Sequence, residues 1–288
     1  MMKRSYIFVL AALFLLPSCS EDFTLDIAGM FSPNGETVNT RFEQSMAYND
    51  SVGETHLNMG ADEYVVYVCS DSHVTRNSHK NLDAFVAAYN AETAPKTAVH
   101  LGDIIDAQNN FACADSVIRL ANAPFFITLG NHDIYFKQWS VFRSYFHTAT
   151  YWFDTYNGTK KLDLFICLDS AEGTLGTAQT DWLRNLLAAK SKEGYRHIVI
   201  FTHTHFWKLD GSQLVTSNFS LEDTYELAAL FAQYGVDYVW SGHQHARQSV
   251  FFKGVEYLVL DATKDKEKGQ SYMTARMSDV VNYQFINY

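Results

Sequence analysis

Five short segments of this sequence combine aspartate, histidine and asparagine side chains at close spacing. They are Asp71-Ser72-His73, Gly102-Asp103-Ile104-Ile105-Asp106, Gly130-Asn131-His132-Asp133, His203 alone, and Gly242-His243-Gln244-His245. Carboxylate, imidazole and amide oxygen groups together suit Mn, Fe, Zn or Co better than Ca. Each segment alone is a weak signal, because such short combinations occur by chance in many chains. The ordered set predicts a transition-metal site.

Each polar segment directly follows an apolar stretch that is typical of a buried strand. The expected strands cover residues 64–70, 97–101, 124–129, 162–168, 197–202 and 237–241. The expected helices between them cover residues 78–89, 115–121, 178–189 and 221–234. This alternation predicts an α/β fold in which helices cover the sheets. Open α/β sheets bind ligands in the crevice beyond the carboxyl ends of their strands, so we expect the five segments to meet there.

In their order, the five segments resemble the calcineurin-like metallophosphoesterase family, whose pattern reads D-x-H, G-D-x-x-D, G-N-H-[DE], a single His and G-H-x-H. The resemblance extends from Asp71 to His245. It implies a four-layer α/β sandwich of two mixed β-sheets flanked by helices, with the metal site at the C-terminal ends of the strands. It also implies a hydrolase of phosphoric esters, either a phosphatase or a phosphodiesterase.

The same resemblance implies two divalent or transition metal ions as cofactors, drawn from Mn, Fe, Zn or Co. The implied ligands are Asp71, His73 and His245 for one ion, Asn131, His203 and His243 for the other, and Asp103 as the bridge. In the implied reaction a metal-bridged hydroxide attacks phosphorus in line, His132 acts as the general acid, and Asp106 orients His132. Asp106 stands where purple acid phosphatases carry a tyrosine ligand, which disfavours that subfamily.

The formal charges of these groups suit a phosphate ester. Two divalent ions bring four positive charges, and Asp71, Asp103 and a bridging hydroxide remove three, which leaves about one for an anionic phosphoryl group. Metal ions roughly 3.5–4 Å apart generate hydroxide near neutral pH and clamp an in-line displacement. His132 must be protonated to act as an acid, but the nearby cations would lower its pKa. A carboxylate partner such as Asp106 favours the charged imidazolium and so offsets that effect. We expect Asp133 to cap the following segment.

Residues near or outside the five segments have further expected roles, and for some of them two alternatives stay open. Arg76, Asn77 and His205 are candidate substrate contacts, and His205 also reads as a rim histidine without a ligand role. Asp169 is expected either to support the site or to serve as a loop or cap residue, and His100 to lie in the core. Surface positions are expected for the histidines that belong to no motif, His56, His79, His147 and His197. Pocket lining or plain packing is expected for the aromatic residues Tyr135, Trp139, Phe206 and Trp207.

Composition limits the class of protein. The chain has 288 residues, with 22 Lys and Arg against 32 Asp and Glu, so its formal net charge is −10. A hydrophobic content of 47% indicates a folded domain rather than a disordered or fibrous chain. The negative charge disfavours non-specific nucleic-acid binding, which relies on Lys and Arg displacing counterions from phosphates.

The N-terminal residues resemble a bacterial lipoprotein signal. Lys3 and Arg4 precede an apolar run over residues 6–16, which is too short to span a bilayer. Cys19 ends a Leu-Pro-Ser-Cys stretch that resembles a lipobox, in which the cysteine becomes lipidated. We therefore expect a signal peptide over residues 1–18, a lipid-anchor tether and N-terminal extension over 19–60, and a catalytic domain over 61–288. The expected location is the bacterial cell envelope, most simply the outer membrane; the other reading is an ordinary signal peptide with an incidental cysteine.

Two functional readings stay open. As an enzyme, the chain is expected to act on a phosphorylated small molecule or a phosphodiester, and the motifs do not separate the two. The alternative is a non-catalytic surface lipoprotein that retains the fold as a binding module, and the intact His132 and Asp106 weigh against it. Residues 20–60 are expected to be mostly irregular, with an outer strand at most. The tail over 250–288 is expected to form strands, with 264–268 as an exposed charged loop.

Overall fold

Two β-sheets lie face to face in the computed structural model, which describes residues 35–106, 108–211, 213–216 and 218–288. The larger sheet has the strand order β1 (Thr55–Asn58), β5 (Tyr151–Asn157), β6 (Lys160–Cys167), β7 (His197–Phe201), β10 (Tyr238–Ser241), β12 (Val255–Val259) and β11 (Gln248–Phe252). The smaller sheet has the order β14 (Asn282–Asn287), β13 (Ser271–Met277), β2 (Tyr64–Cys69), β3 (Lys96–His100) and β4 (Phe125–Ile127). Both sheets mix parallel and antiparallel neighbours.

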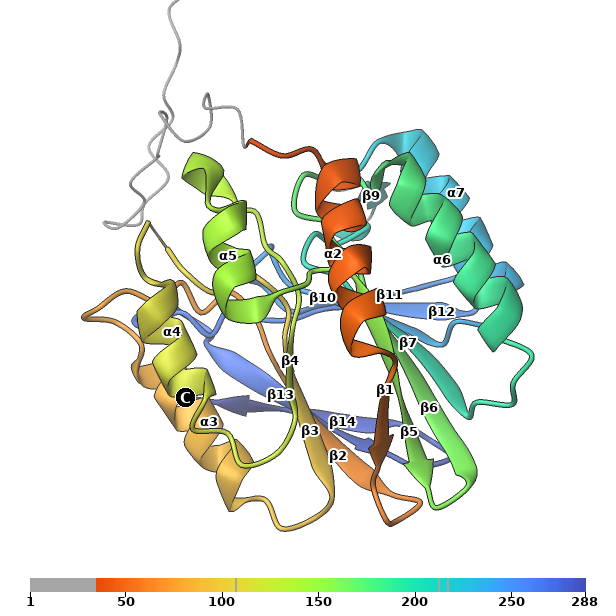
Figure 1. Cartoon of the computed structure of the whole chain (residues 1–288), viewed down its shortest axis with the longest axis horizontal. Helices are drawn as coiled ribbons and strands as arrows, with labels where there is room; N and C mark the ends of the chain where they lie inside the picture. The colour runs from red at the N-terminus through yellow and green to blue at the C-terminus, as the bar shows by residue number, and fades with distance from the viewer. Residues whose placement is uncertain (1–34, 107, 212, 217) are drawn as a thin grey trace, which may run out of the picture.

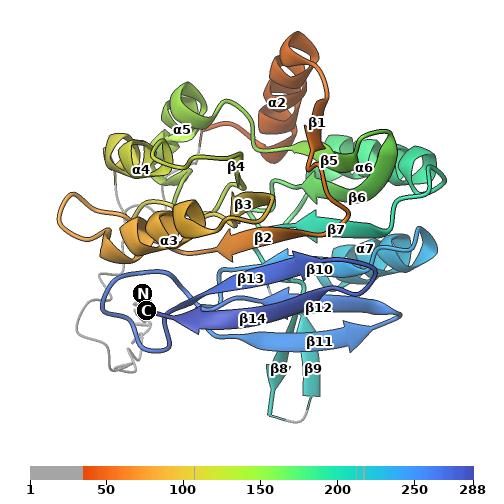
Figure 2. The same ribbon diagram turned by 90° about the horizontal axis from the view of Figure 1, so that it is seen from below.

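Helices cover the outer faces of both sheets (Figure 1). The smaller sheet is covered by α3 (Lys80–Ala91), α4 (Phe111–Ile118) and α5 (Trp139–Phe146), the last preceded by the 3₁₀ turn η1 (Tyr135–Lys137). The larger sheet is covered by α6 (Gly176–Lys190) and α7 (Leu221–Gln233), with α2 (Val38–Val52) lying alongside α6. A ribbon of β8 (Trp207–Asp210) and β9 (Gln213–Thr216) projects from this body (Figure 2). Within the described residues, no helix has both the length and the apolar character needed to cross a bilayer.

The two-residue period of a strand explains how β2 is buried on both faces. Tyr64, Val66 and Val68 point into a cluster between the two sheets, whereas Val65 and Tyr67 pack beneath the helices of the smaller sheet. From the larger sheet, the central cluster receives the stacked rings of Phe153, Phe165 and Phe201. The predicted four-layer α/β sandwich is thereby confirmed.

The apolar runs predicted the central strands and most of the helices, but not α5, β5 or the ribbon of β8 and β9. Each expected strand is present as β2, β3, β4, β6, β7 or β10, and the four expected helices are α3, α4, α6 and α7. The main shift is in α4, which begins at Phe111 rather than at residue 115. The tail forms β11 to β14 as expected, and Cys69 and Cys167 are buried as small apolar side chains.

The expectation of irregular structure before residue 60 is wrong for the described part of that stretch. Helix α2 begins after Thr37, whose hydroxyl accepts a hydrogen bond from the backbone N–H of Thr40 (3.3 Å). Its Arg41 is buried and donates to the carboxylate of Asp169 (2.7 Å). Strand β1 pairs in parallel with β5 at the sheet edge, so the expected outer strand is present. The predicted signal peptide and Cys19 lie outside the described residues.

Candidate metal centre

The five predicted segments meet at one end of the two sheets. Beyond β2 and β3 the chains stay hydrogen-bonded: the N–H of Asp71 donates to the carbonyl of Gly102 (3.0 Å), and that of His73 donates to the carbonyl of Asp103 (3.0 Å). The loops after β7 and β10 approach from the other sheet, because parallel strands of both sheets end on the same side. The hydrogen bonds beyond β2 and β3 fix Asp71 and His73 in position relative to Asp103.

Five of the predicted ligands have a left-handed backbone. The angle φ is 51° at Asp71, 43° at His73, 54° at Asp103, 70° at His243 and 55° at His245. Such conformations cost a non-glycine residue on the order of 1–3 kcal/mol and persist where the surrounding structure enforces them. Asp and His tolerate them better than most residues. The turns that gather the ligands are therefore strained, as expected of a functional site.

Two motif glycines are required by close approach rather than by backbone conformation. A Cβ at Gly130 would overlap the backbone nitrogen of Asp103. A Cβ at Gly242 would overlap the hydroxyl oxygen of Ser70. Neither glycine has a positive φ. Gly130 thus allows the loops after β3 and β4 of the smaller sheet to touch, and Gly242 allows the loop after β10 of the larger sheet to touch the end of β2.

One group of side chains brings together Asp71, His73 and His245. His73 Nε2 lies 3.2 Å from His245 Nε2, which in turn lies 3.3 Å from Asp71 Oδ1. Asp71 Oδ1 is buried and accepts no hydrogen bond among the described residues. A buried carboxylate oxygen facing two imidazole nitrogens fits a bound cation, since buried polar atoms otherwise find hydrogen-bond partners.

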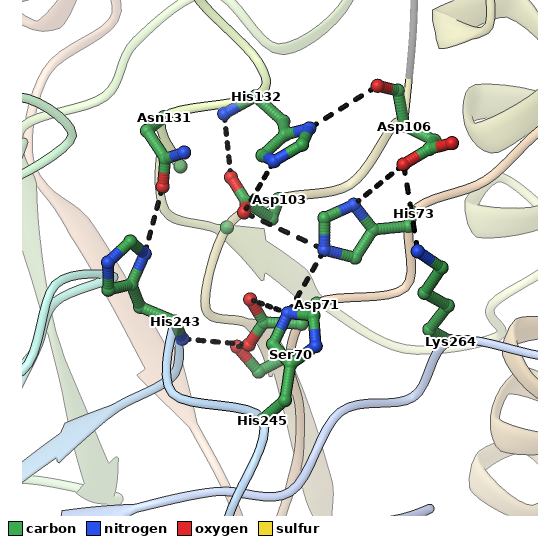
Figure 3. Close-up of polar contacts among 12 residues, drawn as sticks. Ser70, Asp71, His73, Asp103, Asp106, Asn131, His132, His243, His245 and Lys264 are labelled. Carbon is green, nitrogen blue, oxygen red and sulfur yellow. Dashed lines mark hydrogen bonds and ion pairs between the residues drawn. The ribbon is translucent and has the colours of Figure 1, made fainter. Parts of the chain in front are cut away.

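A second group consists of Asp103, His203 and His243, with Asn131 beside them. His203 Nε2 lies 3.4 Å from Asp103 Oδ2 and 3.2 Å from His243 Nδ1. Asn131 Oδ1 lies 2.9 Å from His203 Nε2 and 3.0 Å from His243 Nδ1. Asp103 Oδ2 also lies 3.7 Å from His73 Nε2, so one carboxylate oxygen faces both groups. Figure 3 shows Asp103 between the His73 side and the His243 side of the site.

The buried carboxylates stabilise the protonated form of two histidines in the site. Burial alone would raise the pKa of Asp103, yet the neighbouring imidazoles, His203 first among them, hold it well below its ordinary value. Burial lowers the pKa of a histidine, but Asp103 and Asp71 raise that of His203 to about 9. Asp71 and Glu267 likewise overcome burial and raise the pKa of His245 to about 10. Without metal, the site therefore holds imidazolium cations at neutral pH, which is the behaviour of a site built for positive charge.

His132 lies at the rim of the two groups. Its backbone N–H donates to Asp103 Oδ1 (2.8 Å), its Nε2 lies 4.0 Å from Asp103 Oδ2, and its Nδ1 lies 3.3 Å from the backbone carbonyl of Asp106. The structure differs here from the prediction, because the Asp106 carboxylate does not hydrogen-bond His132. It lies 3.4 Å from His73 Nδ1 and 3.8 Å from Lys264 Nζ (Figure 3). The cationic Lys264 and the His73 imidazole are the electrostatic partners that hold it there.

Asp133 caps backbone groups, but they lie before it and in the loop after β3 rather than, as was expected, in the following segment. Its buried carboxylate accepts hydrogen bonds from the N–H groups of Gly130 (2.9 Å), Ile104 (2.9 Å) and Ile105 (3.3 Å). Burial and the charge of Asp103 raise the pKa of Asp133 to about 8, and the N–H donors oppose that rise. The residue ties the loop after β3 to the loop after β4 and so fixes two of the five segments to each other.

Two contacts of the ligands come from residues beside the motifs. Tyr135 Oη accepts a hydrogen bond from Asn131 Nδ2 (2.9 Å), so this aromatic residue lines the site rather than only packing. The Ser70 hydroxyl donates to Asp71 Oδ2 (2.5 Å). Position next to a motif was the only signal for either residue in the sequence.

Two further contacts come from distant loops and had no sequence signal. Glu267 Oε1 lies 2.8 Å from His245 Nδ1, and Asn218 Nδ2 lies 2.7 Å from His243 Nε2. Glu267 belongs to the charged run that was expected to be an exposed loop. The run is a loop, but Lys264 and Glu267 are partly buried against the site.

The predicted substrate contacts lie in different surroundings. Arg76 and Asn77 are exposed in the turn that follows His73, and their contact with substrate stays a prediction. His205 is buried rather than at the rim, and its ring lies 5.8 Å from that of His243. Burial and the neighbouring histidines lower the pKa of His205 to about 3, so it is neutral at physiological pH.

His100 and Asp169 have structural roles. His100 is the predicted core histidine: its Nε2 lies 2.8 Å from the Ser72 hydroxyl, and its Nδ1 accepts from the N–H of Gly102 (3.2 Å). Of the two roles expected for Asp169, the structure shows the structural one, because its carboxylate holds Arg41 of α2.

Of the four histidines that were expected at the surface, one is buried and three are exposed or partly exposed. His197 is buried, contrary to expectation, with Nε2 2.7 Å from the carbonyl oxygen of Ser278. The histidines with an exposed or partly exposed position are His56, His79 and His147. The aromatic residues that pack in the cores are Trp139, Phe206 and Trp207.

The family model of the calcineurin-like phosphoesterases matches residues 64–247. The chain belongs to this family. The match spans all five segments, so the predicted resemblance and the metallophosphoesterase class are confirmed. Among curated proteins, none matches this phosphoesterase in sequence.

Solved structures share the fold of this phosphoesterase at low identity. GAP50, the anchor in the inner membrane complex of Plasmodium, superposes with a TM-score of 0.54 at 14% identity, over 79% of this chain and 85% of that one. A provisionally assigned 5′-nucleotidase from Staphylococcus aureus, in complex with α-ketoglutarate, superposes with a TM-score of 0.51 at 15% identity. That match covers 78% of this chain and 53% of the nucleotidase, so the chain spans about half of its length. Both likenesses concern the fold alone.

Proposed function

We propose that this phosphoesterase is a binuclear metal-dependent hydrolase of phosphoric esters. The proposed ligands are Asp71, His73 and His245 for one ion, Asn131, His203 and His243 for the other, and Asp103 for both. The observation that carries the proposal is the position of Asp103 Oδ2, 3.7 Å from His73 Nε2 and 3.4 Å from His203 Nε2. A carboxylate shared between two ligand groups is what a two-metal site requires.

Four of the proposed ligands, Asp71, Asp103, His73 and His243, already hold the charge state that cation binding needs. Two divalent ions would supply Lewis acidity and lower the pKa of water at the site to near neutrality. The neighbouring imidazoles lower the pKa of Asp71 and Asp103 against the effect of burial, so both stay ionised. Burial lowers the pKa of His73, and that of His243 to about 4, so both present neutral nitrogens.

His132 is the proposed general acid. Its side chain is 31% exposed, so a leaving group can reach it from solvent, and its Nε2 faces the Asp103 carboxylate. The contact of Nδ1 with the carbonyl of Asp106 favours a proton on Nδ1 and orients the ring. A protonated ring then presents Nε2–H to the leaving-group oxygen, which is the geometry that acid catalysis needs.

Replacing the acid tests this role. His132→Ala is expected to retain bound metal and to lower hydrolysis of esters with poor leaving groups by roughly 10²–10⁴, the usual size of an acid–base contribution. His79→Ala, which changes a partly exposed histidine on the smaller-sheet side, is the matched control and should keep its full rate. An unchanged rate in His132→Ala with poor leaving groups contradicts the assignment.

The substrate is proposed to be a phosphorylated small molecule or a phosphodiester. A screen of phosphomonoesters, cyclic nucleotides, diesters and phospholipid head groups with Mn²⁺ present would separate the two classes. Hydrolysis of any of them supports the enzyme. Full metal occupancy without hydrolysis of any class supports instead the non-catalytic surface protein that uses the same fold for binding.

We also propose that the protein is exported and anchored by a lipid on Cys19 to the bacterial cell envelope, at the outer membrane. The support is the sequence alone: the basic start, the short apolar run and the Leu-Pro-Ser-Cys stretch. Cys19→Ser should move the protein from the detergent phase to the aqueous phase on phase separation. Cys113→Ser is the matched control and should leave partitioning unchanged. Equal partitioning of Cys19→Ser and the parent contradicts the anchor.

A further inference from the structure

The two ligand groups differ in what lies behind their histidines. On the Asp71 side, the outward nitrogen of each imidazole faces a carboxylate. His245 Nδ1 lies 2.8 Å from Glu267 Oε1, and His73 Nδ1 lies 3.4 Å from Asp106 Oδ1. A histidine whose other nitrogen donates to a carboxylate is held in one tautomer and is a more basic metal ligand.

On the Asn131 side, the outward partners are neutral. His203 Nδ1 lies 2.9 Å from the backbone carbonyl of Leu101, and His243 Nε2 lies 2.7 Å from the side-chain amide of Asn218. The ligand Asn131 is itself a neutral group, so Asp103 is the carboxylate ligand on this side, and it is shared with the other group. The Asp71 side therefore carries more negative charge than the Asn131 side.

Glu267 is held in place by its own loop. Two residues earlier, the carboxylate of Asp265 accepts hydrogen bonds from the backbone N–H groups of Lys80 (3.0 Å) and Asn81 (2.9 Å), at the start of α3. This cap fixes the loop between β12 and β13 against the smaller sheet. Lys264 of the same loop lies 3.8 Å from the Asp106 carboxylate and acts on the charges of both Asp106 and Glu267. The two carboxylates differ in their contact with the histidines: Glu267 lies 2.8 Å from His245 Nδ1, whereas His73 Nδ1, 3.4 Å from Asp106, makes no hydrogen bond among the described residues.

We propose that the two metal positions bind unequally, and that Glu267, which belongs to none of the five segments, is the positioning residue that makes the Asp71 side the tighter one. This inference rests on the proposed two-metal function. Glu267 holds a proton on His245 Nδ1, so that Nε2, which faces Asp71, is the nitrogen left for the metal once the ring has lost its other proton. The first cation to bind then occupies the Asp71 side, and the Asn131 side fills at higher metal concentration.

The test is a calorimetric titration of the full, metal-free protein with Mn²⁺. The parent should show two binding steps. Glu267→Gln should weaken the tighter step by about 10–100-fold, the usual effect of removing such a partner, and leave the weaker step unchanged. Asn131→Ala should remove the weaker step and keep the tighter one. Glu256→Gln, the same substitution at a carboxylate bonded to Ser249 and Tyr283 away from the site, should change neither step.

A double-mutant cycle distinguishes positioning from a general loss of structure. In a His245→Ala background, Glu267→Gln should have no further effect on metal affinity, because its partner is gone. A further loss in that background contradicts the inference, and so does an unchanged tighter step in Glu267→Gln alone. Two equal steps in the parent overturn the inference but leave the two-metal function standing. No binding of Mn²⁺, Zn²⁺ or Co²⁺ by the parent overturns the function itself.

Discussion

The carboxylate of Asp106 lies 3.4 Å from Nδ1 of His73. Asp106 hydrogen-bonds His132 only through its backbone carbonyl, at 3.3 Å from Nδ1, and its carboxylate lies within 4.8 Å of a His132 ring nitrogen. The family pattern pairs the Asp106 side chain with the general acid His132. In this structure the same side chain faces Nδ1 of His73, a proposed metal ligand. Its negative charge acts first on the His73 imidazole and only through space on His132.

Asp106→Asn tests this division of roles. Asparagine keeps the backbone carbonyl, so His132 should keep its orientation, whereas His73 loses its carboxylate partner. We expect Mn²⁺ affinity to fall by about tenfold and the rate at saturating metal to fall less than in His132→Ala. Metal titration and the dependence of rate on leaving-group pKa measure the two effects. Unchanged affinity together with a loss confined to poor leaving groups would show that Asp106 serves the acid after all.

Asp133→Ala should destabilise the protein strongly. The change leaves three buried backbone N–H groups without an acceptor, and each such loss costs about 1–3 kcal/mol. We expect the free energy of unfolding to fall by about 3 kcal/mol or more in urea titration. Asp181→Ala, at an exposed position on α6, is the control and should cost little. A loss below about 1 kcal/mol in Asp133→Ala contradicts the capping role.

Substitutions in the Arg41–Asp169 pair test whether α2 contributes to the stability of the domain. Both side chains are buried, and breaking a buried pair by removing one partner costs roughly 3–5 kcal/mol. Arg41→Met should therefore lower the free energy of unfolding by about that amount, and Arg41→Met with Asp169→Leu should recover part of it. Lys160→Met breaks an exposed pair with Asp62 and should cost less than about 1 kcal/mol. Equal effects of Arg41→Met and Lys160→Met would show that α2 adds little to the fold.

Metal binding should release protons. Carboxylates raise the pKa of His203 to about 9 and of His245 to about 10, so both rings are protonated at pH 7 without metal, and both must lose the proton to bind it. Saturation at pH 7 should therefore release about two protons per chain. Affinity should rise with pH up to about pH 9–10 and then level off. Calorimetry in buffers of different ionisation enthalpy counts the protons, and a pH-independent affinity between pH 6 and 9 contradicts the charge states.

The sequence predicts the site well where ligand and strand are neighbours along the chain. Asp71, Asp103 and His203 lie two or three residues beyond the end of an apolar strand, so strand direction alone brings them together. These features depend on local spacing, which a single sequence contains.

What the sequence did not predict depends on pairings across long stretches of chain. Helix α2 has a weak apolar face, and its Arg41 is buried only because Asp169, 128 residues away, neutralises it. Glu267 reaches His245 from a loop whose charge pattern reads as solvated. The direction of the Asp106 carboxylate depends on Lys264, which no motif contains. Such contacts exist only once the fold has formed.

The most direct test of the two-metal site is anomalous diffraction from crystals of the protein saturated with Mn²⁺ or Zn²⁺. Two anomalous peaks are expected, one on either side of Asp103 Oδ2. The first should lie among Asp71, His73 and His245, and the second among Asn131, His203 and His243. A single peak at saturating metal, or no peak within ligand distance of Asp103, would contradict the shared-carboxylate site.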